Sequence, residues 1–125
     1  MIVGIGTDIA KVSRFERWTK DPPMICRFFN TNEMNTAKSM QASCEHYAAR
    51  FAAKEAFGKA LGIGLAGFSL RDVYITNDQN GKPALNVCGS AQKILKSMYG
   101  DCYVHVSLTH EKEYAVAFVI IEKKD

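Results

Sequence analysis

Residues 45–61 have the sequence EHYAARFAAKEAFGKAL, and this stretch decides the fold prediction. It is rich in alanine and other strong helix formers, and Gly62 and Gly64 follow it. Because glycine commonly ends helices, the pattern predicts a long helix over 45–61 that stops at these glycines. One face of that helix carries the residues at i, i+3, i+4 and i+7, which are Ala48, Phe51, Ala52 and Glu55.

Glu55 is the unusual member of this face, because the other three side chains are apolar. A carboxylate on an inward stripe has to be paired, protonated or bound to a metal, since burying a lone charge is costly. The simpler alternative is an ion pair with Lys59, which follows at i+4 in the favourable order. The sequence leaves both interpretations open.

Shorter elements flank the long helix. We predict a helix over 10–18 that is ended by Pro22-Pro23. A second, short helix is expected after Asn30, where Glu33 completes a capping box. A third is expected to begin at a Ser90 cap and to run to about Tyr99. Alternating or apolar runs predict strands over 2–9, 73–76, 83–87, 103–109 and 114–122. Antiparallel hairpins mixed with helices predict one α+β domain over residues 1–125.

The composition is that of an ordinary globular protein. The chain has 125 residues, of which 47% are hydrophobic and 23% charged. No apolar run reaches the roughly 20 residues that span a bilayer, and the N-terminus lacks the basic region of a signal peptide. The four cysteines are not at zinc-ligand spacing, so we expect isolated thiols and a cytoplasmic protein without a membrane partner.

The positive charge is concentrated near the N-terminus. The whole chain has a net charge of +3, and the segment 11–27, with five basic and two acidic residues, accounts for all of it. A basic patch on a balanced body indicates docking to an acidic surface. The alternative is a solvated helix face.

Asp8 ends an apolar strand that contains Gly4 and Gly6, and glycine in a strand often marks the close approach of a ligand or of another backbone. The alternative role for this aspartate is an N-cap for the next helix. Two carboxylates from separate elements, such as Asp8 and Glu55, suit Mg²⁺, which often takes only one or two protein carboxylates beside phosphates.

Further polar residues could contact phosphates. Lys59, Lys82 and His105 offer positive charge, and Asn80-Gly81-Lys82-Pro83 forms a tight turn that is otherwise only a hairpin connection. His105, Ser107 and Thr109 share one strand face, which is most simply a face turned to solvent. The chain lacks both a G-x-S-x-G elbow and a G-x-G-x-x-G fingerprint, which argues against a serine hydrolase and a Rossmann site.

Four ordered blocks resemble the holo-acyl-carrier-protein synthases, the small bacterial class of 4′-phosphopantetheinyl transferases. The blocks are Gly4-Ile5-Gly6-Thr7-Asp8-Ile9, Arg50-Phe51-Ala52-Ala53-Lys54-Glu55-Ala56-Phe57 with Lys59-Ala60-Leu61-Gly62, Gly81-Lys82-Pro83, and His105-Val106-Ser107-Leu108-Thr109-His110-Glu111 with Tyr114-Ala115-Val116-Ala117. They span essentially the whole chain. The resemblance implies an antiparallel sheet with a long central helix and shorter helices.

The resemblance also implies an activity and its residues. The enzyme would transfer 4′-phosphopantetheine from coenzyme A to a serine of apo acyl carrier protein in fatty acid biosynthesis, releasing adenosine 3′,5′-bisphosphate. Asp8 and Glu55 would bind Mg²⁺, and the catalytic residues would be Glu55, Lys59 and His105. The coenzyme A site would include Lys59, Gly62, Lys82, Pro83, His105, Ser107 and Thr109. The general base stays open between Glu55, a metal-bound water and His105.

Further implications concern partners. The resemblance implies a homotrimer with active sites between subunits and no nucleic-acid partner. Arg14, Arg17 and Arg27 would dock the acidic helix of acyl carrier protein. Two departures are Gly58, where the family often has Ser or Ala, and the segment 19–41, which matches least. The rival hypotheses are a non-catalytic module that binds an acidic protein and another magnesium-dependent nucleotide enzyme.

Overall fold

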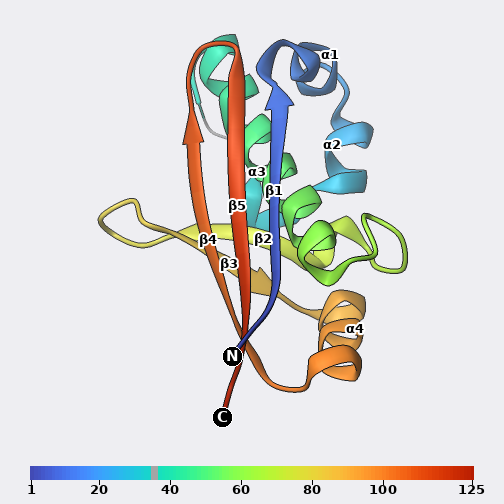
Figure 1. The fold of residues 1–125 in the computed structure, drawn as a ribbon. Helices are drawn as coiled ribbons and strands as arrows, with labels where there is room; N and C mark the ends of the chain where they lie inside the picture. Colours follow the sequence, from blue (N-terminus) through green and yellow to red (C-terminus); the bar gives the residue numbers. More distant parts are fainter. Residues whose placement is uncertain (35–36) are drawn as a thin grey trace.

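A computed structural model describes residues 1–34 and 37–125 and has two antiparallel sheets (Figure 1). Strands β1 (Ile2–Lys11), β5 (Tyr114–Lys123) and β4 (Cys102–His110) form the larger sheet in that order, with β5 in the centre. Strands β2 (Val73–Asn77) and β3 (Pro83–Val87) form a separate hairpin. The α+β prediction is therefore confirmed.

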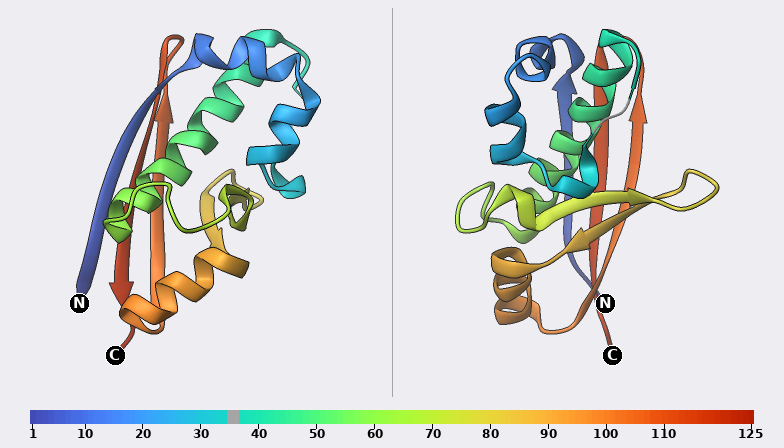
Figure 2. Two further views of the ribbon diagram at one scale, coloured as in Figure 1. Left: turned by 90° about the vertical axis from the view of Figure 1, so that its right-hand side faces the viewer. Right: turned by 180° about the vertical axis from the view of Figure 1, so that it is seen from behind.

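The helices lie on one side of the larger sheet (Figure 2). The long helix α3 (Met40–Leu61) crosses that face, and α4 (Gly89–Tyr99) lies near one end of the molecule. The described residues also form three 3-10 turns: η1 (Val12–Phe15), η2 (Thr31–Glu33) and η3 (Leu70–Asp72). None of the described helices is long and apolar enough to cross a membrane.

Two glycines allow β1 to lie directly on α3. A Cβ on Gly4 would overlap the carbonyl of Ala60, and a Cβ on Gly6 would overlap the carbonyl of Ala56. The strand and the helix backbone are thus in contact where any side chain would separate them. Since side chains alternate along a strand, the next residue on this inner face is Asp8.

The N-terminal region differs from the predicted helix over 10–18. The ladder of β1 continues to Lys11, which pairs with Tyr114, so a strand occupies the start of that range. After η1, the helix α1 (Glu16–Thr19) is only four residues long. Pro22-Pro23 does not merely end an element but begins α2 (Pro22–Phe28), because proline at the first helical positions needs no N–H partner.

Two further boundaries differ from the sequence prediction. Helix α3 begins at Met40, where the Ser39 side chain accepts a bond from Ala42 N, so it is five residues longer than predicted. Ser90 lies inside the first turn of α4 and is not its cap; its hydroxyl donates to Asp72 Oδ2 at 2.6 Å. The Asn30–Glu33 capping box is present as predicted, on the 3-10 turn η2.

Candidate active site

Asp8 and Lys59 meet at the edge of the sheet where β1 lies on α3. The Lys59 ammonium donates to Asp8 Oδ1 at 3.0 Å and to the Thr7 carbonyl at 3.2 Å. Asp8 lies inside β1, opposite Ala117 of β5, so it is not a helix N-cap. The expected i, i+4 pairing of Lys59 with Glu55 is replaced by this contact between two elements.

Glu55 completes this corner with an unpaired carboxylate. Within residues 1–34 and 37–125, the structure assigns its side chain no hydrogen bond or ion pair. Partial burial, and secondarily the nearby charge of Asp8, raise the pKa of Glu55, while Lys59 and Arg14 act in the opposite direction. Two carboxylates that repel each other, one of them without a partner, favour a bound cation.

The donor set fits a magnesium ion. Among the described residues there is no group of three or more His, Cys, Asp or Glu side chains arranged to hold a metal. Mg²⁺ does not need one, because it commonly uses one or two carboxylates together with phosphate oxygens and water. Asp8, with a side chain only 17% exposed, and Glu55 provide those two carboxylates.

A second group of polar residues lines a cavity of about 430 Å³ between the first half of α3, the β2–β3 hairpin and the end of β4. Arg50 lies in its wall: one terminal nitrogen donates to Asn77 Oδ1 at 2.9 Å and the other to the His46 carbonyl at 3.3 Å. Its Nε is buried without a partner. Pro83 and His110 also line the cavity.

Arg50 suits its side of this cavity to an anionic group such as a phosphate, while the Glu45 side chain also lines the cavity and lies 3.7 Å from His110 Nδ1. A guanidinium held in place by two hydrogen bonds still has N–H groups for phosphate oxygens. Burial, with a smaller effect from Arg50, lowers the pKa of His46 to about 4, so Arg50 and not His46 provides the positive charge at neutral pH. Neither Arg50 nor His110 was predicted as a site residue, although both lie in the motif blocks. They come from separate elements, α3 and β4, and only the folded structure shows that both line one cavity.

The other predicted ligand-binding residues lie apart from the Asp8 corner. His105, Ser107 and Thr109 are exposed on the outer face of β4, away from α3, and His105 Nε2 lies 2.9 Å from Glu122 Oε1. Gly62 ends α3, one turn after Lys59, with a φ of 84°. Lys82 is exposed in the β2–β3 connection, where its N–H donates to Asp78 Oδ1.

The three predicted docking arginines are exposed on the N-terminal elements. Arg14 is in η1 and Arg17 in α1, while Arg27 is in the last turn of α2. Arg14 and Arg17 line the same surface hollow, whose volume is about 430 Å³. The basic segment therefore forms surface that is open to a partner.

Glu55 and the cavity lie on opposite sides of α3. Glu55 follows His46 by nine residues, which is about 2.5 helical turns, and the two side chains therefore point in opposite directions. The single chain thus carries two separate half-sites: the corner of Asp8, Glu55 and Lys59, and the cavity of Arg50 and His110.

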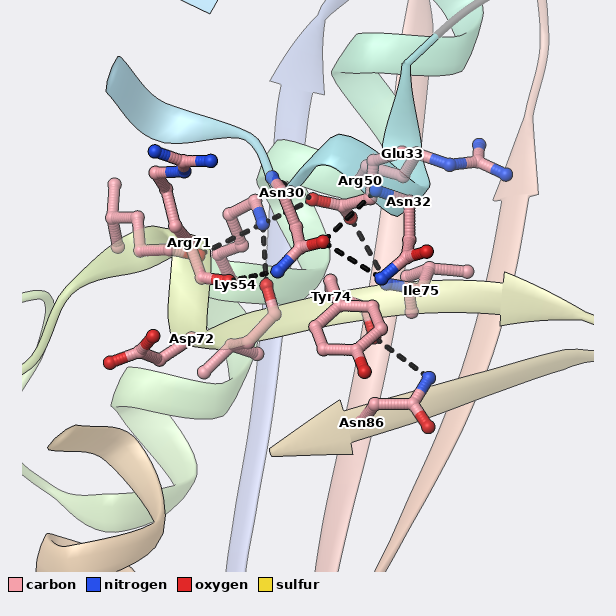
Figure 3. A network of polar contacts seen from close by, with 12 residues as sticks. Asn30, Asn32, Glu33, Arg50, Lys54, Arg71, Asp72, Tyr74, Ile75 and Asn86 are labelled. Carbon is pink, nitrogen blue, oxygen red and sulfur yellow. Dashed lines mark hydrogen bonds and ion pairs between the residues drawn. The ribbon is translucent and has the colours of Figure 1, made fainter. Parts of the chain in front are cut away.

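A buried network fixes α3 between these half-sites (Figure 3). The Lys54 ammonium donates to Glu33 Oε1 at 2.7 Å, to Leu70 O at 3.0 Å and to Val73 O. The other oxygen of Glu33 accepts a bond from Ile75 N at 3.0 Å. Lys54 directly precedes Glu55, so the network sets the rotation of α3 that turns Glu55 toward Asp8.

Comparison with known proteins places this arrangement in a family. A holo-[acyl-carrier-protein] synthase of Treponema denticola is 50% identical over 123 residues, which cover 98% of this chain and 99% of that protein. The crystal structure of the Neisseria meningitidis synthase has 36% identity and a TM-score of 0.86, covering 98% of this chain and 100% of that one. A Bacillus anthracis synthase in complex with CoA (3′,5′-ADP) has 37% identity and a TM-score of 0.81, covering 99% of both chains.

The family model of the 4′-phosphopantetheinyl transferase superfamily matches residues 4–119, a range that spans both half-sites and the buried network. The family model, the sequence identity and the fold agree, and the chain belongs to the 4′-phosphopantetheinyl transferase superfamily.

Proposed function

We propose that this protein transfers 4′-phosphopantetheine from coenzyme A to a serine hydroxyl of apo acyl carrier protein, releasing adenosine 3′,5′-bisphosphate. The corner of Asp8, Glu55 and Lys59 carries the proposal, because it combines an unpaired carboxylate with an adjacent ammonium group. The names of the relatives, and the coenzyme A bound to the Bacillus anthracis synthase, support the choice of donor and acceptor.

In this proposal Asp8 and Glu55 would hold Mg²⁺. When bound, the ion would neutralise phosphate charge and polarise the reacting phosphorus. Lys59 lies 3.0 Å from Asp8 and would offset negative charge on the leaving phosphate. Phosphoryl transfer depends mainly on positioning and charge neutralisation, which these three side chains supply without covalent participation.

Glu55 is the proton acceptor that the proposal favours within one chain. Its carboxylate makes no hydrogen bond or ion pair among the described residues, which leaves an oxygen free to accept a proton. His105 lies on the outer face of the sheet beside Glu122. It would reach a reacting hydroxyl only if it belonged to a neighbouring subunit.

A homotrimer with sites between subunits is part of the proposal. The sheet face that no helix covers (Figure 2) exposes large apolar side chains, including Ile5 at 60% and Ile9 at 61%. Phe118 pairs with Thr7, which lies between these two isoleucines, and so shares their face. Such a face commonly marks a protein interface. The two half-sites lie on opposite sides of α3, so in this proposal one coenzyme A molecule takes the carboxylate corner from one copy and the Arg50 cavity from another. A head-to-tail contact of this kind forms a closed ring, such as a trimer, when its rotation closes.

The basic N-terminal surface is proposed to dock the acidic helix of the carrier protein. Arg14, Arg17 and Arg27 are exposed and close in sequence, and like-signed charge on one surface attracts an oppositely charged partner. We also propose a cytoplasmic location, because the free cysteines fit a reducing compartment.

The test is to incubate the protein with apo acyl carrier protein, coenzyme A and Mg²⁺ and to measure the carrier mass by mass spectrometry. The expected result is a mass increase equal to one phosphopantetheine and a matching release of adenosine 3′,5′-bisphosphate. A stable complex with unmodified carrier would instead indicate a binding module. Turnover of ATP without modification of the carrier would indicate a different nucleotide enzyme.

A further inference from the structure

Arg14 lies with its guanidinium over a surface made of three aromatic rings. Its Cζ is 5.0 Å from the ring centroid of Phe51, 5.6 Å from that of Phe15 and 5.7 Å from that of Trp18. These rings come from η1, α1 and α3, so the contact joins the basic segment to the long helix. A cation within about 6 Å of a ring centroid is attracted to the ring face.

The three rings differ in how firmly they are held. Phe15 and Phe51 are buried in the core, whereas Trp18 is partly exposed. The Trp18 ring lies 4.9 Å from Phe15 and 5.3 Å from Phe51, measured between centroids. Trp18 is therefore the most exposed of the three rings, although it also lies 5.3 Å from the ring of Phe28 and 6.3 Å from that of Phe29.

The ring contacts restrict Arg14 without using its hydrogen-bonding capacity. A free arginine side chain samples many rotamers, and ordering it on binding costs free energy. Stacking uses the face of the guanidinium and leaves its N–H edge available to a carboxylate. In the described part of the chain, the Arg14 side chain makes no hydrogen bond or ion pair, so that edge is open.

Arg17 provides a natural comparison. It is exposed three residues further along the same segment and lines the same hollow, but it contacts no aromatic ring among the described residues. One arginine of the pair is thus packed on aromatic rings, and the other is exposed without such a contact among the described residues.

We propose that Trp18 is a positioning residue for carrier-protein recognition, which holds the Arg14 guanidinium in the orientation that meets an acidic group of the docked partner. The inference rests on the proposed function and deepens its docking step. Arg14 contacts Phe51, which lies about one helical turn before Glu55 on α3. A partner held by Arg14 therefore arrives beside the candidate reaction centre.

The test is a double-mutant cycle on the full-length protein, with the KM for apo acyl carrier protein and kcat as readouts. We expect Trp18→Leu to raise that KM about 5-fold with little change in kcat or in the KM for coenzyme A. We expect Trp18→Phe to restore the KM to within about 2-fold of the wild type. In an Arg14→Gln background, Trp18→Leu should change the KM by less than about 2-fold, because the group it positions is absent.

Arg17→Gln is the matched control. In an Arg17→Gln background, Trp18→Leu should raise the KM for apo acyl carrier protein by the same factor as in the wild type. Arg14→Lys provides a second route if Trp18→Leu folds poorly: it keeps the charge but loses the planar stacking, and we expect a KM close to that of Trp18→Leu. An equal effect of Trp18→Leu with and without Arg14, or an unchanged KM in both Trp18→Leu and Arg14→Lys, would overturn the inference. Failure of the proposed function is separate, since the wild-type protein would then not modify the carrier at all.

Discussion

The Lys54 ammonium lies 2.7 Å from Glu33 Oε1, and both side chains are completely buried. The remaining donors of Lys54 bond to the carbonyls of Leu70 and Val73, and Glu33 also accepts bonds from Asn30 N and Ile75 N. Every group in the pair is therefore satisfied. The pair joins η2, α3 and the start of β2 beside the candidate active site.

Lys54→Met should lower the free energy of unfolding by about 3–5 kcal/mol, because it leaves the Glu33 carboxylate buried without a counter-charge. Urea denaturation measures the change. The control is the double variant Glu33→Gln/Lys54→Met, in which no charge is buried and the single amide oxygen still accepts a bond from one of the two backbone N–H groups, that of Asn30 or that of Ile75. It should be more stable than Lys54→Met alone, and a double variant less stable than the single one would contradict the charge argument.

Glu55→Gln should reduce turnover of coenzyme A by about 100-fold or more while the protein stays folded, because the amide cannot supply the second anionic ligand. Binding of Mg²⁺, measured by calorimetry in the absence of substrate, should weaken in parallel. Glu113→Gln, a change at an exposed carboxylate outside both half-sites, is the control. Near-normal turnover of Glu55→Gln at saturating Mg²⁺ would refute the metal assignment.

Gly58→Ala should destabilise the protein by about 1–3 kcal/mol, although glycine to alanine in a helix interior usually stabilises by about 1 kcal/mol. A Cβ at this position would overlap the carbonyl of Gly64, and the N–H groups of Ile63 and Gly64 both bond to Gly58 O at 3.1 Å. Thermal unfolding gives the sign of the change. A higher melting temperature in the variant would mean that the loop after α3 moves without cost.

The stability should fall as the pH drops from about 6.5 toward 4 because of His46. Burial lowers the pKa of this residue to about 4 in the folded protein, while the unfolded chain keeps the ordinary value of 6.5. The unfolded state therefore binds a proton first, and the stabilisation present above pH 6.5 is lost on acidification.

The wild type should lose about 2 kcal/mol more than His46→Gln between pH 7 and 4.5, after allowance for the partial exposure of the ring. Glutamine can still donate to the Glu33 carbonyl that His46 approaches at 2.6 Å. Parallel pH profiles for the two proteins would show that His46 does not titrate in this range.

Local pattern was sufficient to predict the long helix and the hairpins, because their periodicity and turn residues lie within a few positions of each other. It did not reveal which charges pair. Lys59 bonds to Asp8 across 51 residues and Lys54 to Glu33 across 21, and such pairing is set by the way β1 and η2 pack on α3.

The predicted site residues fall into two groups that lie in different places, and their spacing in the sequence does not show this division. Asp8, Glu55 and Lys59 do lie together, whereas His105, Ser107 and Thr109 face away from them on β4. The cavity is lined by Pro83, which was predicted, and by Arg50 and His110, which were not. A motif on one strand fixes which residues share a face, but the sheet topology decides which face that is.

The position of the two half-sites on opposite sides of α3 has a genetic consequence. In the proposed trimer, Glu55 and Arg50 of any one reaction centre belong to different polypeptides. Co-expression of Glu55→Gln with Arg50→Gln should therefore produce hybrid oligomers in which some centres receive two unaltered halves, so two inactive alleles complement each other. Substituting both positions in the same polypeptide removes that possibility, because no partner in such an oligomer retains an intact half.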